Sequence, residues 1–110
     1  MKEIRAIIRP QKLPRLREVL RSMPGFPGMT GSKAFGCGST LRHAPQNIKE
    51  ELVDFTEKVR EEIIAPDELV DALVDHIVQV ATTGQTGDGL VWVNDVQRAV
   101  FIRKTVGPDS

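Results

Sequence analysis

The stretch from Thr83 to Val93 reads TGQTGDGLVWV, and the elements on its two sides differ in kind. Upstream, after a break at Pro66, apolar residues recur at helical spacing: Leu69, Val70, Leu73, Ile77, Val80 and Ala81. The stretch itself holds three glycines and ends in a short apolar run, residues 90–93, that is typical of a buried strand. A Gly-rich turn therefore joins a helix to a strand, which is the reverse of the order in a Rossmann or P-loop phosphate motif.

The N-terminal half shows one strand pattern and one helix pattern before it loses its period. Residues 2–9 alternate apolar and polar side chains, and residues 13–23 carry a helical stripe that stops at Pro24. Residues 28–39 are punctuated by glycine and predict a strand that runs into a loop. Residues 40–51 have no period, so we expect a long exposed loop there. At this length a functional role explains a loop better than mere connection does.

The C-terminal half is less clear in one segment. Residues 52–64 mix apolar and charged side chains, and from periodicity alone a helix and a strand are both defensible. Residues 98–103 predict a last strand after a turn at Asn94–Asp95. The order of these elements predicts an α+β two-layer sandwich of the split βαβ kind.

Composition excludes several functional classes. The chain has 110 residues with 15 Lys+Arg against 15 Asp+Glu, which predicts one domain over residues 1–110 and no globally basic surface for nucleic acid or membrane. Its single cysteine, Cys37, allows no intramolecular disulfide, and two histidines with one cysteine cannot build a four-ligand zinc site without carboxylates. No apolar run is long enough for a signal peptide or a membrane span, so we expect a cytoplasmic protein without membrane insertion.

No catalytic constellation stands out, which makes an enzyme the weaker hypothesis. His43 and His76 lie far apart in the sequence, and the paired carboxylates are typical of solvated faces. The Gly-rich turn at residues 83–89 could point successive amide N–H groups at an anion, although a plain tight turn is the alternative. With the second Gly-rich run at residues 35–40 and the cations Lys58 and Arg103, it would make a phosphate cradle if the fold brought these parts together.

Four segments resemble the PII signal-transduction family of nitrogen-regulatory proteins. They are the opening residues 1–13, Gly28-Met29-Thr30, residues 53–59, and residues 83–103 with the GDG turn and Val91-Trp92-Val93. The resemblance implies a ferredoxin-like βαββαβ core in which residues 55–64 form a strand. It also implies a long T-loop at about residues 39–53, a compact homotrimer, and non-catalytic regulation through adenine-nucleotide clefts between subunits.

The resemblance further implies two sets of functional residues. The nucleotide-binding set is Ile8, Thr30, Gly36, Cys37, Gly38, Lys58, Glu62, Ile64, Gly87, Asp88, Gly89 and Arg103. The partner-binding loop set is Ser39, Thr40, Arg42, His43, Lys49 and Glu51. The implied ligand is ADP, ATP or AMP, with no required cofactor and no metal or catalytic residue. The implied partner is a membrane transporter, a metabolic enzyme or a regulator of nitrogen metabolism.

Several departures from the family pattern alter these expectations. Leu90, Phe101 and Ser39 stand where the family usually has cations, so triphosphate binding should suffer more than mono- or diphosphate binding. Thr40 replaces the glutamine that binds 2-oxoglutarate with Mg-ATP, which puts both 2-oxoglutarate and Mg in doubt. Glu51 occupies the position of the modifiable tyrosine, and the chain has no tyrosine, so uridylylation on tyrosine is impossible.

Two alternatives within the same fold stay open. The apolar Leu90 and Phe101 would suit a less charged ligand such as bicarbonate. A metal-related trimer would be favoured by metal binding through His43 or Cys37. Cys37 itself fits a redox-sensitive thiol or a small apolar filler.

Overall fold

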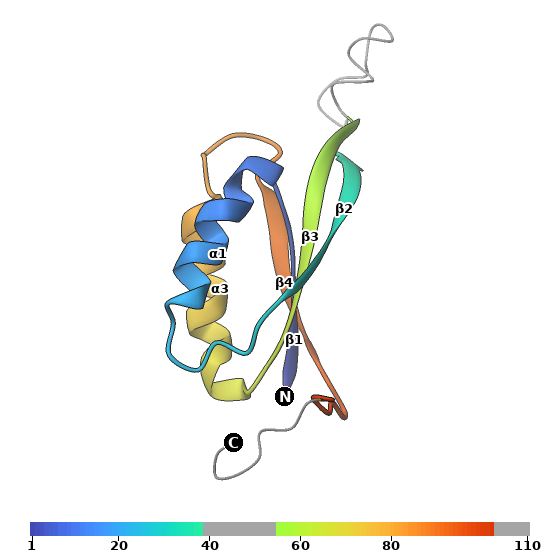
Figure 1. Ribbon diagram of the computed structural model, residues 1–110. Helices are drawn as coiled ribbons and strands as arrows, with labels where there is room; N and C mark the ends of the chain where they lie inside the picture. Colours follow the sequence, from blue (N-terminus) through green and yellow to red (C-terminus); the bar gives the residue numbers. More distant parts are fainter. Residues whose placement is uncertain (39–54, 103–110) are drawn as a thin grey trace, which may run out of the picture.

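The structure is a computed structural model that describes residues 1–38 and 55–102 (Figure 1). Its elements are β1 (Lys2–Ile8), the 3₁₀ turn η1 (Pro10–Lys12), α1 (Leu13–Arg21), β2 (Thr30–Cys37), β3 (Phe55–Ala65), α3 (Asp67–Ala81) and β4 (Gly89–Asp95). This is the βαββαβ order expected for a ferredoxin-like fold. The predicted T-loop at residues 39–53 lies outside the described residues.

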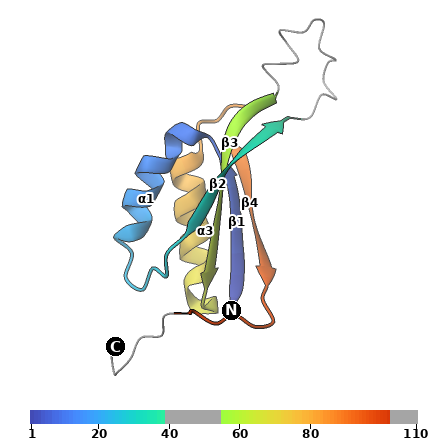
Figure 2. The same ribbon diagram turned by 45° about the vertical axis from the view of Figure 1, so that its right-hand side comes forward.

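The four strands form one antiparallel sheet in the order β2-β3-β1-β4. Both helices cover the same face of this sheet, which confirms the two-layer α+β sandwich (Figures 1 and 2). β1 lies between β3 and β4, and its last residue, Ile8, is paired with Val59 on one side and Gly89 on the other. The end of β1 is therefore the point where β3 and β1 lie beside the turn before β4.

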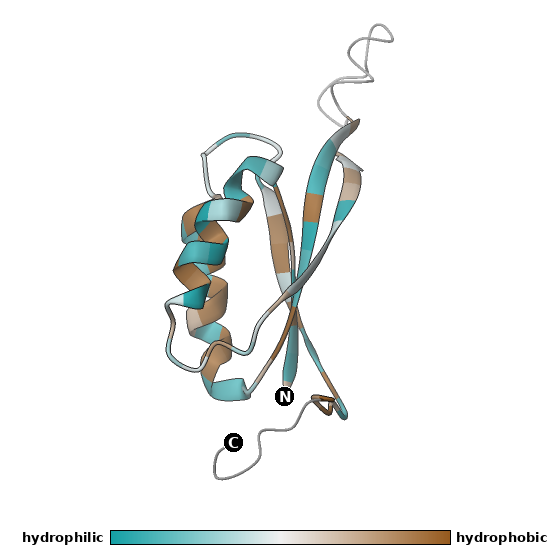
Figure 3. Ribbon diagram, viewed as in Figure 1, coloured by the Kyte–Doolittle hydropathy of each residue, from teal (hydrophilic) through white to brown (hydrophobic). Residues whose placement is uncertain are grey.

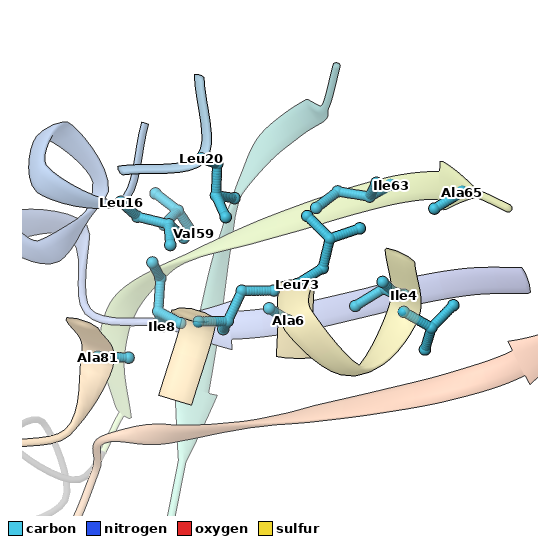
Figure 4. Close-up of a cluster of buried hydrophobic side chains, with 12 residues drawn as sticks. Ile4, Ala6, Ile8, Leu16, Leu20, Val59, Ile63, Ala65, Leu73 and Ala81 are labelled. Atoms are coloured by element: carbon cyan, nitrogen blue, oxygen red, sulfur yellow. The ribbon is translucent and has the colours of Figure 1, made fainter. Parts of the chain in front are cut away.

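The core fills the space between the helices and the sheet (Figure 4). The buried hydrophobic residues are Ile4, Ala6, Ile8, Leu16, Leu20, Val59, Ile63, Ala65, Val70, Leu73, Ile77 and Ala81. The helices contribute residues at the predicted spacings of three and four, and Figure 3 shows hydrophobic residues along both of them. The two helices predicted from periodicity are thus confirmed, with α3 beginning directly after Pro66.

The ambiguous segment is a strand, as the family resemblance implied. In β3, Val59, Glu61, Ile63 and Ala65 are buried at every second position, which is the period of a strand. Glu61 is a carboxylate on the core side and is only 5% exposed. It has room because its partner across the strands is Gly31, where a Cβ would overlap the Glu61 carboxylate. A charged residue at a core position explains why the sequence pattern was unclear.

The predicted last strand at residues 98–103 is wrong over residues 98–102, the part that the structure describes. The chain leaves the sheet after Asp95, and the Val96 N–H donates to the Met1 carbonyl. Val100, Phe101 and Ile102 are exposed, Ile102 at 99%. An alternating pattern becomes a strand only when another strand accepts its hydrogen bonds, and no described strand lies beside this segment.

The paired ends of β2 and β3 extend beyond the helices (Figure 1). There the rings of Phe35 and Phe55 stack with their centroids 5.7 Å apart, and both are more than half exposed. Within the ranges 1–38 and 55–102, no helix is both long and apolar enough to cross a membrane.

Candidate functional site

The turn between α3 and β4 is organised by the carboxylate of Asp88. Its Oδ2 accepts hydrogen bonds from the backbone N–H groups of Thr83 at 2.7 Å and Gly84 at 3.0 Å. The Thr83 hydroxyl donates to Oδ1. The hydrogen bonds from Thr83, first from its hydroxyl and then from its backbone, hold the pKa of Asp88 far below the usual range of an aspartate. Asp88 is therefore an anionic anchor for the whole turn.

Two glycines allow the chain to leave the turn and enter β4. Gly87 and Gly89 have φ values of +94° and +103°, in the left-handed region where L side chains are strained. A Cβ at Gly89 would also overlap the carbonyl oxygen of Ile7 on the neighbouring strand. The GDG pattern is thus required by the backbone path itself, whatever the turn binds.

The strand register brings two cations to this turn. Extending the β1 pairing by one residue beyond Ile8 places Arg9 between Lys58 and Asp88. Arg9 Nε donates to Asp88 Oδ1 at 3.2 Å, and Arg9 Nη2 donates to the Thr86 carbonyl at 2.7 Å. Lys58 Nζ donates to the Gly87 carbonyl at 2.6 Å. Three charged side chains from three parts of the sequence therefore meet around Gly87.

Lys58 is the more buried of the two cations, with 9% of its surface exposed. Burial lowers its pKa, and the nearby Arg9 guanidinium lowers it further, while Asp88 acts in the opposite direction. The Arg9 charge, in contrast, is paired directly with Asp88. Lys58 is thus the cation here whose charge would gain most from an anionic ligand.

About half of the predicted nucleotide-binding set gathers at this end of the sheet. Besides the turn residues and Lys58 it includes Ile8, which is buried, and Gly36, where a Cβ would lie 3.8 Å from Lys58 Cγ. An apolar hollow of about 100 Å³ adjoins the turn, and the exposed Leu90 is part of its wall. Cys37 and Gly38 lie further out, where β2 ends opposite Phe55.

A second group of predicted residues lies elsewhere. Thr30, Glu62 and Ile64 line a hollow of about 480 Å³, which Phe101 also borders. Ile64 follows Lys58 by six residues along β3, and at about 3.3 Å per residue the two are roughly 20 Å apart. One chain does not bring the two groups of the predicted cleft together.

Glu62 in this second hollow is already engaged by a cation. Arg5 Nε lies 3.3 Å from a Glu62 carboxylate oxygen and 3.1 Å from a Glu3 carboxylate oxygen. Arg5 Nε is buried and has no hydrogen bond of good geometry within the described residues, so both contacts are charge pairs only. The hollow combines the carboxylates of Glu3 and Glu62 with apolar walls from Ile64 and Phe101.

Sequence reasoning missed Arg9. Its place at the end of a strand pattern and before Pro10 was visible, but only the pairing of β1 between β3 and β4 puts it beside Asp88. Arg103 and the complete set proposed for partner binding lie outside the described residues. That set is Ser39, Thr40, Arg42, His43, Lys49 and Glu51.

Comparison with known proteins gives a consistent result. The family model described as "Nitrogen regulatory protein P-II" matches residues 1–106. The chain is 44% identical over 104 residues to nitrogen regulatory protein P-II 1 of Escherichia coli (strain K12), covering 94% of this chain and 92% of that protein. It is 43% identical to the P-II protein of Klebsiella oxytoca and 42% identical to that of Haemophilus influenzae, with the same coverage.

Proposed function

The chain belongs to the nitrogen regulatory protein P-II family, and from this premise we propose that it is a non-catalytic, cytoplasmic sensor of adenine nucleotides. ATP, ADP or AMP binds in clefts between the subunits of a homotrimer. The bound nucleotide changes the T-loop, residues 39–53, and thereby controls a transporter, an enzyme or a regulator of nitrogen metabolism. The observation that carries the proposal is the convergence of Lys58 and Arg9 on the Gly87 turn.

The phosphate end of the ligand fits the turn. A left-handed glycine next to two cations gives backbone N–H groups and positive charge in one place, which is what anion binding needs. The base and ribose fit the second hollow, where Thr30 and Glu62 offer polar groups beside the side chain of Ile64. Thr40 stands in place of the family's glutamine, so the proposal includes neither 2-oxoglutarate nor Mg.

The separation of the two groups supports an intersubunit cleft. A ligand that uses both cannot span roughly 20 Å on one chain with its phosphates and base in contact, so a neighbouring subunit must supply one of the groups. No described helix or strand covers the sheet face opposite the helices (Figures 1 and 2). Leu90, Phe101 and Ile102 are exposed apolar residues of the kind that assembly buries.

Calorimetric titration of the purified protein with ATP, ADP and AMP tests the proposal, with light scattering to measure the assembly. We expect binding of at least one nucleotide at one site per chain and a mass of three chains. The absence of binding heat with all three nucleotides, confirmed by an unchanged melting temperature, would refute nucleotide sensing. A monomer that binds nucleotide would refute the intersubunit cleft alone.

One observation favours a second candidate, a sensor of a smaller anion such as bicarbonate. Leu90 is 60% exposed next to the turn, at a position where the family usually has a cation. An apolar wall suits a ligand with less charge than a triphosphate. Stabilisation by bicarbonate but by none of the nucleotides, in a thermal-shift series at constant ionic strength, would favour this candidate over the first.

A further inference from the structure

The two cations at the Gly87 turn differ in what they hold. Arg9 bridges two acceptors on the residues before and after Gly87, the Thr86 carbonyl and the Asp88 carboxylate. Among residues 1–38 and 55–102, Lys58 contacts a single acceptor, the Gly87 carbonyl. The planar, forked guanidinium is suited to a bridge of this kind, whereas an ammonium is a compact charge on a flexible stem.

These contacts fix the direction of two backbone N–H groups. In a planar trans peptide the carbonyl of one residue and the N–H of the next point in opposite directions. Because the Thr86 carbonyl points to Arg9, the Gly87 N–H points away from it. Because the Gly87 carbonyl points to Lys58, the Asp88 N–H likewise points away from Lys58. Within the described residues neither N–H group donates to a backbone carbonyl outside the strands or to a side chain, so both are available to a ligand.

Arg9 and Lys58 also differ in how their charges are paired. Arg9 is paired with Asp88 at 3.2 Å, so its charge is largely compensated without any ligand. No described carboxylate lies within ion-pair distance of Lys58 Nζ. An ammonium has three N–H donors, and the Gly87 carbonyl uses one of those on Lys58.

We propose that Arg9 is a positioning residue, which orients the Gly87 amide and holds the Asp88 carboxylate so that the turn is set for the phosphate group that Lys58 contacts in the proposed function. This inference rests on the proposed nucleotide-sensing function. Arg9 and Lys58 should therefore affect nucleotide binding in different ways, although both are cations. Loss of Arg9 should weaken the binding of every nucleotide through the amides that all of them share, whereas loss of Lys58 should matter more as phosphate charge increases.

The test measures AMP, ADP and ATP dissociation constants by calorimetry for the wild type, Arg9→Met, Arg9→Lys and Lys58→Met. The control is Arg21→Met, since Arg21 is an exposed arginine and the last residue of α1. We expect Arg9→Met to weaken all three nucleotides by a similar factor of about ten, the size of a lost charge-assisted hydrogen bond. Lys58→Met should weaken ATP more than AMP. Arg9→Lys should restore part of the loss, and Arg21→Met should bind as the wild type does.

A loss in Arg9→Met that grows steeply from AMP to ATP would show that Arg9 contacts phosphate directly, and unchanged binding would show that it has no role. Amide hydrogen exchange of the nucleotide-free protein supplies a second measurement. The Thr83 and Gly84 amides should lose protection in Arg9→Met and keep it in Arg21→Met. If the wild type binds no nucleotide, the proposed function fails. Unchanged amide protection in Arg9→Met would separately refute the role of Arg9 in positioning the turn.

Discussion

Replacing the buried carboxylate of Glu61 should stabilise the protein, and the gain should depend on pH. Glu61 is 5% exposed on the core side of β3. Burial raises its pKa above the ordinary value of 4.5, the positive charge of Arg17 opposes this shift, and the neighbouring Glu62 adds to it. The folded state therefore holds this proton more tightly than the unfolded state does.

The direction of the pH dependence follows from that difference. Below pH 4.5 the carboxyl is protonated in both states, so its ionisation does not affect stability. As pH rises through 4.5 and then through the raised pKa of the folded state, the unfolded chain loses its proton first, and the free energy of unfolding falls. Each unit by which the folded pKa exceeds the unfolded one corresponds to about 1.4 kcal/mol.

Two substitutions separate charge from shape. Glu61→Gln removes the charge and keeps the size, so it should match the wild type at pH 4 and exceed it in stability at pH 8. Glu61→Leu also removes the buried polar atoms, and since Gly31 leaves room above the side chain, we expect a gain of about 1–3 kcal/mol at pH 7. In melting temperature this is about 4–8 °C for each kcal/mol in a domain of this size.

The assay is urea unfolding at pH 4 and pH 8, at one fixed protein concentration because the proposed assembly would contribute to stability. Glu57→Gln is the matched control, since Glu57 is an exposed glutamate on the same strand. It should change stability by less than about 0.5 kcal/mol at either pH. Equal stability of Glu61→Gln and the wild type at pH 8, or a loss in Glu61→Leu, would refute the reasoning.

Three further predictions concern the turn before β4. Gly89→Ala should lower the melting temperature strongly because the added Cβ would overlap the Ile7 carbonyl. Gly38→Ala is the control and should leave the melting temperature unchanged, because the space around Gly38 is open. Equal melting temperatures of the two variants would contradict this reasoning. Asp88→Asn should weaken nucleotide binding and destabilise the protein at pH 7. Its difference from the wild type in thermal unfolding should shrink as pH falls below the ordinary Asp value of 3.8, because the unfolded chain then takes up a proton while the lowered pKa keeps the folded carboxylate charged. Leu90→Lys should raise ATP affinity by about ten- to a hundredfold and AMP affinity by less, whereas Leu90→Met should leave both affinities unchanged. Equal gains for both nucleotides in calorimetry would contradict a direct phosphate contact.

The elements that sequence predicted well are those whose determinants are local. α3 begins after Pro66 and buries one helical stripe, and α1 ends shortly before Pro24. β3 was ambiguous because Glu61 occupies a core position that only the glycine on the neighbouring strand can accommodate. The segment 98–102 alternates as a strand does but has no described partner, and pairing is not a property of the segment itself.

The same limit explains the candidate site. Gly87, Asp88, Gly89 and Lys58 could be found from the sequence because a family pattern marks them, but Arg9 is defined by register, since β1 must lie between β3 and β4 before it meets Asp88. Register also places Lys58 and Ile64 at opposite parts of one continuous strand. In the proposed homotrimer each β3 would therefore serve two clefts, with its Lys58 end in one and its Ile64 end in the next. A change in β3 would then reach two of the three ligand sites, which gives the trimer a direct physical route for coupling between them.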